Sequence, residues 1–358
     1  MKQLFFTPGP AELYFTVETH VKNALNEHIP SVSHRSKAFE GIYREAVQNL
    51  KDLLELPDNY HIFFTGSATE IWERILENCV ESQSYHYVNG AFSKRFYETG
   101  LQLKKNPLHQ KAADGTCSSV NTSDIPDTTE LIVFTQNETS TGAAQPLSDI
   151  YTAREAHPGK LIAVDAVSSL PYIDIDYHKV DTVFFSVQKG FGLPAGLGVW
   201  LVNDRCLEKA DQLATKGINI GTYHSLPSLL AKAQKNQTPE TPNVLGIYLL
   251  AKVAGDMLKK GIGRIRQESE YKAAVLYNLI EHHARFSPFV KEAKYRSSTV
   301  IVAETVVSSS EIIQKLLERN LVIGTGYGTY KNQHIRIANF PTHSREKVEM
   351  LADYLQAM

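Results

Sequence analysis

Six short apolar runs, separated by helical patterns, dominate the first half of the chain. The runs that predict strands are His61–Thr65, Tyr85–Val88, Leu131–Thr135, Leu161–Asp165, Val180–Ser186 and Leu197–Val202. Several of them are β-branched or aromatic at consecutive positions, which is typical of strands covered on both faces. Helices are predicted between them, for example at Thr69–Val80, Ser93–Lys104 and Ser148–His157. Strands that alternate with helices predict an α/β fold with a largely parallel sheet.

The pattern changes near residue 240. The stretch Gln237–Asn243 contains two prolines and two threonines and should form neither helix nor strand. A smaller α+β set follows, with helices predicted at 244–260, 262–284, 309–319 and 345–356 and strands at 299–303 and 334–338. We therefore expect a large domain of residues 16–242 and a small domain of residues 243–358, which the N-terminal segment 1–15 joins.

Charge and composition exclude several classes of function. The chain has 37 basic and 39 acidic side chains, and without a block of like charges it shows no nucleic-acid-binding footprint. No apolar run approaches the roughly 18 residues of a membrane span, and Leu4–Phe6 is too short for a signal peptide. The cysteines, at 79, 117 and 206, are too scattered for a disulfide framework or a zinc site. We expect a cytoplasmic protein without a metal, a nucleic-acid partner or a membrane partner.

Polar residues follow three of the predicted strands, at the sheet edge where open parallel sheets bind ligands. Gln136–Gly142, Asp165–Ser169 and Gln188–Gly190 bring hydroxyls, amides, one carboxylate and one amine. A desolvated Lys189 could attack a carbonyl carbon to form a Schiff base. Asp165 could keep a pyridine nitrogen protonated, which makes the ring an electron sink. The alternatives are a structural ion pair, or two unrelated surface residues.

A phosphate site is predicted at Gly66–Glu70, which follows a strand and opens a helix. Small residues there allow backbone N–H groups to bind a phosphate. The alternative is a capping box between Ser67 and Glu70, which needs no ligand. A phosphate site here, with Asp165 and Lys189, would describe a site for pyridoxal phosphate.

A dinucleotide fingerprint competes with this interpretation. Gly190–Ala195 matches G-x-G-x-x-A, and Asp211 follows about 20 residues later. The fingerprint requires a helix directly after the glycines, whereas Pro194 and residues 196–202 predict a turn and a strand. We therefore do not expect nucleotide binding, although a non-catalytic α/β protein remains an alternative.

Two arginine sites are candidates for anion binding. Arg336 lies in the middle of a predicted strand, where its charge is costly unless an anion pairs with it. A guanidinium binds a carboxylate with two parallel hydrogen bonds. His34 and Arg35 lie in a polar loop between helices. The alternatives are an internal salt bridge for Arg336 and a solvated loop for His34 and Arg35.

Together these motifs, in their order along nearly the whole chain, resemble the class V aminotransferases. Four segments look most like phosphoserine aminotransferases, namely 33–35, 137–139, 237–242 and 336–341, whereas 141–142, 145–147 and 164–167 are shared with alanine–glyoxylate and serine–pyruvate aminotransferases. The resemblance implies a fold-type-I enzyme with pyridoxal 5'-phosphate as its cofactor. It also implies a large domain with a mostly parallel, seven-stranded sheet between helices, a smaller α+β domain, and a homodimer.

The resemblance also assigns roles around the cofactor. Lys189 would form the Schiff base, Asp165 would pair with the pyridine nitrogen, and Thr139 would bond near the phenolic oxygen. Phe92 would stack on the ring, at a position where the family usually has tryptophan. The residues that would hold the phosphate are Ala68, Thr69 and Gln188, with Gln237 and Thr238, or Thr241 in place of Thr238, from the neighbouring subunit.

For the substrate, the resemblance places the α-carboxylate on Arg336 and the distal anion on His34 and Arg35. The chain departs from the bacterial phosphoserine pattern at Thr329-Tyr330, where a second basic pair is expected and only the next residue, Lys331, is basic. The implied reaction converts 3-phosphohydroxypyruvate and glutamate to phosphoserine and 2-oxoglutarate, in serine biosynthesis. The alternative is transfer from alanine or serine onto glyoxylate or pyruvate.

Overall fold

A seven-stranded sheet forms the centre of the chain in the computed structural model, which describes residues 3–358. The strands run in the order β2-β10-β9-β8-β5-β3-β4, and only β10 is antiparallel to its neighbours. Their bounds are β2 Tyr60–Thr65, β3 Ser84–Val88, β4 Leu108–Lys111, β5 Leu131–Thr135, β8 Leu161–Asp165, β9 Thr182–Ser186 and β10 Gly198–Asn203. The six predicted strands are confirmed, and the sheet is largely parallel as expected.

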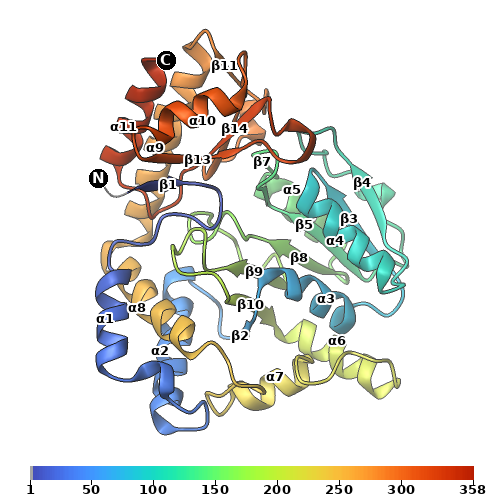
Figure 1. Cartoon of the computed structure of the whole chain (residues 1–358). Helices are drawn as coiled ribbons and strands as arrows, with labels where there is room; N and C mark the ends of the chain where they lie inside the picture. The colour runs from blue at the N-terminus through green and yellow to red at the C-terminus, as the bar shows by residue number, and fades with distance from the viewer. Residues whose placement is uncertain (1–2) are drawn as a thin grey trace.

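Both faces of this sheet are covered, which explains the continuous apolar runs (Figure 1). In β5, Leu131 and Val133 pack into one apolar cluster and Ile132 and Phe134 into the other. One face is covered by α3 (Ala68–Cys79), α4 (Ala91–Gln102), α6 (Asp204–Thr215) and α7 (Leu226–Ala233). The other is covered by α1 (Val17–Asn26), α2 (Lys37–Leu54), α5 (Leu147–Ala156) and α8 (Val244–Lys260).

A second sheet, in the order β1-β13-β14-β12-β11, combines both ends of the chain (Figure 1). Its strands are β1 Leu4–Phe6, β11 Phe286–Pro288, β12 Val300–Thr305, β13 Leu321–Thr325 and β14 His334–Ala338, packed with α9 (Ile262–His282), α10 (Ser309–Leu317) and α11 (Arg345–Gln356). Since β1 pairs with β13, the N-terminal segment adds a strand to this sheet. The predicted strands and helices after residue 243 are confirmed.

The linker Gln237–Asn243 forms neither helix nor strand, as expected. Helix α8, directly after it, packs against α2 and shares the core of the large sheet. Helix α9 runs from that core at Ile265 to the core of the second sheet at Leu276. The domain division at residue 242 stays a prediction. None of the helices in residues 3–358 combines the length and apolar character needed to cross a membrane.

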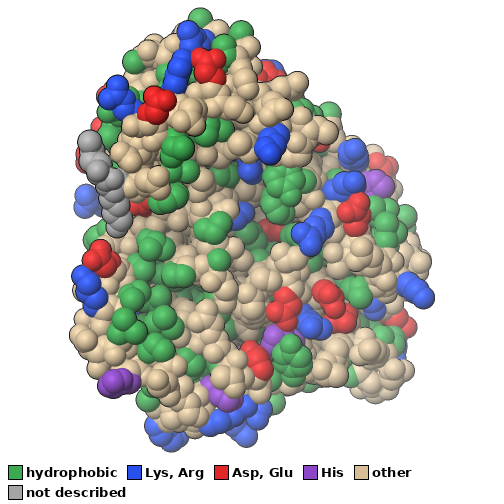
Figure 2. All heavy atoms as spheres, in the orientation of Figure 1, with side chains coloured by type: hydrophobic (Ala, Val, Ile, Leu, Met, Phe, Trp, Pro, Cys, Tyr) green, Lys and Arg blue, Asp and Glu red, His purple; other side chains and the backbone are tan. Residues whose placement is uncertain are grey.

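The surface is hollowed between the parts built on the two sheets (Figure 2). The strands β5, β8 and β9 point their carboxyl ends toward this region, because they are parallel neighbours. Two short strands in the same region, β6 (Asn137–Glu138) and β7 (Ala143–Ala144), form a separate hairpin after β5.

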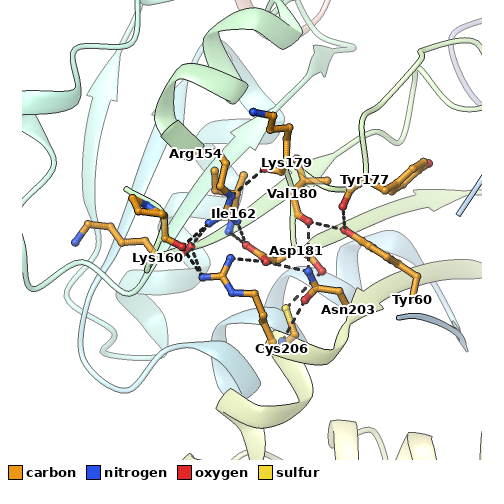
Figure 3. A network of polar contacts seen from close by, with 12 residues as sticks. Tyr60, Arg154, Lys160, Ile162, Tyr177, Lys179, Val180, Asp181, Asn203 and Cys206 are labelled. Atoms are coloured by element: carbon orange, nitrogen blue, oxygen red, sulfur yellow. Dashed lines mark hydrogen bonds and ion pairs between the residues drawn. The ribbon is translucent and has the colours of Figure 1, made fainter. Parts of the chain in front are cut away.

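A buried polar network stabilises the amino-terminal end of the large sheet, opposite the carboxyl ends of β5, β8 and β9 (Figure 3). The carboxylate of Asp181, which is 1% exposed, accepts from Ile162 N at 2.7 Å, from Asn203 Nδ2 at 2.9 Å and from Arg205 Nη1 at 2.9 Å. It also pairs with the guanidinium of Arg154. Every cation and amide in this network has a partner within the described chain, so its role is structural.

Replacing Asp181 with alanine should lower the free energy of unfolding by about 3–5 kcal/mol, because Arg154 then stays buried without its carboxylate. Denaturant titration measures this change, and kcat should stay near wild type because the network lies at the far end of the sheet. The control is Asp174→Ala, which removes an exposed partner of Arg266 and should change stability by less than about 1 kcal/mol. Equal losses in the two variants would contradict this account.

Candidate active site

A cavity of about 420 Å³ lies at the carboxyl edge of the large sheet, against the second sheet. Its wall includes the ends of β5, β8 and β9, the first residues of α3 and α4, and parts of β13 and β14. Eight of the predicted site residues line it: Ala68, Thr69, Phe92, Thr139, Asp165, Gln188, Lys189 and Arg336. Segments far apart in the sequence therefore meet where the open sheet predicts a ligand.

Lys189 lies in the turn after β9 and is buried, with its Nζ donating to Thr139 Oγ1 at 2.9 Å. Burial lowers the pKa of this amine, while the negative charges of Asp165 and Glu138 oppose the shift. Gly9 packs directly on the lysine side chain, because a Cβ on Gly9 would lie only 2.8 Å from Lys189 Cε. The φ of Gly9, +118°, also favours glycine at this position. The amine is therefore both positioned and easier to deprotonate than an exposed lysine.

Asp165 ends β8 and is 3% exposed. Its Oδ2 accepts from Trp72 Nε1 at 3.1 Å and its Oδ1 from Val167 N at 3.0 Å. Burial raises the pKa of this carboxyl, opposed by the hydrogen bond from Val167 and by the charge of Lys189. Among the ion pairs of residues 3–358, none joins Asp165 to Lys189, so the two groups line one cavity without neutralising each other directly.

Phe92 lies with its ring centroid 5.4 Å from Lys189 Nζ, on the first turn of α4. A fully buried carboxylate, Glu138, holds that turn by accepting from Phe92 N at 3.3 Å and Ser93 N at 3.0 Å. The same carboxylate accepts from Ser140 N at 3.1 Å. Glu138 thus joins the loop that carries Thr139 to the helix that carries Phe92, a role that its sequence motif did not reveal.

The N-terminus of α3 opens into the cavity through Ala68 and Thr69. Ser67 caps the helix by accepting from Glu70 N at 3.2 Å, but the Glu70 carboxylate accepts from Gly66 N rather than from Ser67 N. Half of the predicted capping box is therefore present. The cap leaves small residues and a helix N-terminus facing the cavity, which suits a phosphate.

Two buried oxygen atoms of cavity-lining side chains lack a hydrogen-bond partner within residues 3–358. They are Gln188 Oε1 and Thr135 Oγ1. Buried polar atoms are normally paired, so both oxygens have hydrogen-bonding capacity left for a bound group. The cavity thus combines a buried amine, a buried carboxylate, an aromatic ring near the amine and a helix N-terminus, and this set fits pyridoxal phosphate.

Arg336 reaches the cavity from the middle of β14. Its Nε donates to Thr325 O at 2.7 Å and its Nη1 to Thr139 O at 3.1 Å, while its guanidinium stacks 5.4 Å from the ring centroid of Tyr327. The ion pairs found in residues 3–358 include none with Arg336, so the predicted alternative of an internal salt bridge is wrong. Its charge is free to bind a carboxylate.

Four predicted residues lie outside this cavity and form one group, the Arg35 cluster: His34, Arg35, Gln237 and Thr238. Arg35 Nη1 donates to Gln237 Oε1 at 3.1 Å and to Thr238 O at 2.6 Å, and Arg35 Nη2 donates to Pro239 O at 2.9 Å. The structure therefore does not bring these residues to the cavity of their own chain. Thr329 and Tyr330, at the departing positions, line a separate cavity of about 330 Å³ that shares Tyr327 with the first.

The two glycines of the dinucleotide fingerprint, Gly190 and Gly192, allow close packing of the chain and do not begin a nucleotide-binding helix. After Gly192 the chain makes a turn and enters β10, so the helix that a dinucleotide site requires does not follow. A Cβ on Gly190 would lie 2.1 Å from Leu170 O, and one on Gly192 would lie 2.6 Å from Tyr14 N. The predicted turn and strand after Gly192 are confirmed.

The chain is similar to known proteins over most of its length. The family model described as aminotransferase class-V matches residues 6–349. The chain is 28% identical to a phosphoserine aminotransferase of Rhodococcus opacus over 330 residues, and also 28% identical to one of Corynebacterium glutamicum over 328 residues. Each alignment covers 89% of this chain and 85% of the relative.

Two solved structures show how far the likeness extends. The phosphoserine aminotransferase SerC of Cytophaga hutchinsonii is 52% identical, with a TM-score of 0.97 and coverage of 99% of this chain and 98% of that one. The alanine–glyoxylate aminotransferase of Nostoc sp. is 22% identical, with a TM-score of 0.86 and coverage of 100% and 95%. The likeness to the Nostoc enzyme shows only that the fold is shared. The likeness to the Cytophaga enzyme includes half of the amino-acid sequence as well as the fold.

Proposed function

Because the chain belongs to the class-V aminotransferases, which use pyridoxal phosphate, we propose that it converts 3-phosphohydroxypyruvate and glutamate to phosphoserine and 2-oxoglutarate. The observation that carries this proposal is the 52% identity, over nearly the whole chain, to a phosphoserine aminotransferase. Such a reaction would belong to serine biosynthesis. The three cysteines are buried and free, which suits the reducing cytoplasm that we propose as its location.

The residues that line the cavity would divide the chemistry of amino transfer. When bound, pyridoxal phosphate supplies a carbonyl for the Schiff base and an electron sink for the charge that develops at the substrate Cα. Lys189, with its lowered pKa, would move the proton from the substrate Cα. Asp165 would keep the pyridine nitrogen protonated, Thr139 would orient the lysine amine and the phenolic oxygen, and Phe92 would hold the ring plane.

Arg336 is the proposed partner of the substrate α-carboxylate. Two backbone carbonyls fix its guanidinium at the cavity wall, so little side-chain entropy is lost when the carboxylate binds. The phosphate of the cofactor would lie at the N-terminus of α3, with Gln188 beside it.

The Arg35 cluster is proposed to complete the site of a second copy of the chain. Its four residues lie outside their own cavity, although a distal phosphate or γ-carboxylate requires a cation. Large apolar side chains near α1 are exposed, including Phe15 at 76%, Leu25 at 57% and Leu13 at 47%. Figure 2 shows apolar side chains gathered over α1 and α8 below the hollow, which suits an interface between two copies.

Mixing two inactive variants tests the shared site. If Lys189 and Arg35 of different subunits form one site, dimers of Lys189→Ala with Arg35→Ala chains contain one intact site. Random exchange of subunits should then restore about a quarter of wild-type activity, since half the dimers are mixed and half their sites are intact. Each variant assayed alone is the control, and a mixture no more active than the sum of the two would contradict the arrangement.

Substrate preference tests the proposed reaction itself. We expect kcat/KM for phosphoserine to exceed that for alanine by more than tenfold, which corresponds to about 1.4 kcal/mol of discrimination. The second candidate is a transaminase that transfers the amino group of a small amino acid, such as alanine or serine, to glyoxylate or pyruvate. It is favoured by Thr329-Tyr330, which stand where phosphoserine aminotransferases are expected to have a basic pair. A preference below tenfold would support that candidate.

A further inference from the structure

We propose that Trp72 is a positioning residue that holds the Asp165 carboxylate in place for the pyridine nitrogen of the cofactor. This inference rests on the proposed role of Asp165. Trp72 is 3% exposed, and its Nε1 donates to Asp165 Oδ2 at 3.1 Å at the wall of the cavity. Within the described chain, its indole N–H donates the only hydrogen bond that a side chain makes to this carboxylate; the other donor is the backbone N–H of Val167.

The indole itself is firmly oriented. It stacks on the Phe96 ring of α4 with centroids 5.6 Å apart and planes 17° from parallel. The guanidinium of Arg95 lies 6.0 Å from its ring centroid. Because a buried indole cannot turn without breaking this packing, the N–H is fixed in the direction of Asp165.

Helix α3 therefore contributes to two parts of the proposed cofactor site, namely the phosphate site and the carboxylate that would pair with the pyridine nitrogen. Ala68 lies at its N-terminus, where a phosphate fits, and Trp72 lies one turn later on the same side of the helix. The distance between the phosphate site and the indole that donates to Asp165 is thus set by one helix turn. The sequence pattern does not identify Trp72 as a site residue, because nothing in Ile71–Arg74 shows which strand the indole will contact.

The hydrogen bond also acts on the charge of Asp165. Burial raises the pKa of this carboxyl, while the N–H groups of Val167 and Trp72 and the cation of Lys189 lower it and the carboxylate of Glu138 raises it. Without the indole donor the pKa should rise further. The carboxylate would then be a poorer partner for a protonated ring nitrogen, and its rotamer would be less defined.

The test compares Trp72→Phe with Trp200→Phe, its matched control. The chain has two tryptophans, and Trp200 is also buried, donating to Thr182 Oγ1 at 2.7 Å within the large sheet. Trp72→Phe should weaken pyridoxal phosphate binding by about tenfold and lower kcat by about tenfold, with KM changed less than twofold. Trp200→Phe should leave all three within about twofold. Values near wild type in both variants would overturn the proposal.

A second measurement does not depend on activity. In the Trp200→Phe variant freed of cofactor, Trp72 is the sole tryptophan, and its fluorescence should change in one step as Asp165 titrates. The step should disappear when Asp165→Asn is added. If it persists unchanged, Trp72 does not sense Asp165 and the inference fails, even if the protein is an aminotransferase. If the step is present but the protein transfers no amino group, the contact stands, but both the proposed function and the role of Trp72 toward the cofactor fail.

Discussion

Replacing Lys189 with alanine should lower kcat by at least about 10⁴-fold, because it removes both the amine for the Schiff base and the group that moves the α-proton. The effect should appear in kcat rather than in KM, since Arg336 and the phosphate site remain. Steady-state assays with phosphoserine and 2-oxoglutarate measure both constants, and single-turnover assays separate chemistry from product release.

A second buried lysine provides the control for this variant. Lys272 is 1% exposed, its Nζ donates to Phe340 O at 3.0 Å and His343 O at 2.8 Å, and burial lowers its pKa to about 7. Lys272→Met should lower stability but leave kcat within about threefold, because this lysine does not line the cavity. If Lys189→Ala kept full turnover, the proposed role of Lys189 would be wrong.

Replacing Asp165 with asparagine should lower kcat by about 10²–10³-fold, the loss typical of removing one preorganised electrostatic partner. The change preserves the size of the side chain and a potential acceptor for Trp72, but it removes the negative charge that stabilises a protonated pyridine nitrogen. Binding of pyridoxal phosphate should also weaken, and a fluorescence or absorbance titration measures its dissociation constant.

Asp181→Asn is the matched variant for Asp165→Asn. It also neutralises a buried aspartate of the large sheet, but at the opposite edge, among Arg154 and Arg205. It should lower the free energy of unfolding while leaving cofactor affinity near wild type. If the two variants lost cofactor affinity equally, the loss would reflect general destabilisation and would contradict the role given to Asp165.

The sequence was informative where burial on both faces produces unbroken apolar runs. The strands β5, β8 and β9 and the polar residues that follow them could be placed correctly, and with them Asp165, Thr139 and Lys189. The edge strand Leu108–Lys111 escaped prediction because it is largely exposed and reads as a polar segment. The strand Leu321–Thr325 was also missed, although it pairs with β1 and β14.

Contacts between distant segments were beyond the reach of sequence patterns. Trp72 meets Asp165 only because α3 docks on the sheet, and Gly9 meets Lys189 only because the N-terminal segment crosses the cavity. The position of Arg35 is similar: its sequence suggested anion binding, but its hydrogen bonds go to the segment around Thr238. Such pairings depend on tertiary packing that periodicity and spacing do not encode.

Reduction of the purified protein with borohydride in the presence of pyridoxal phosphate, followed by mass mapping of its peptides, tests the account most directly. We expect one phosphopyridoxyl group per chain, attached to Lys189 and absent from the Lys189→Ala variant. Attachment to another lysine such as Lys272, or no attachment at all, would contradict the central claim that the buried amine beside Asp165 is the one that binds the cofactor.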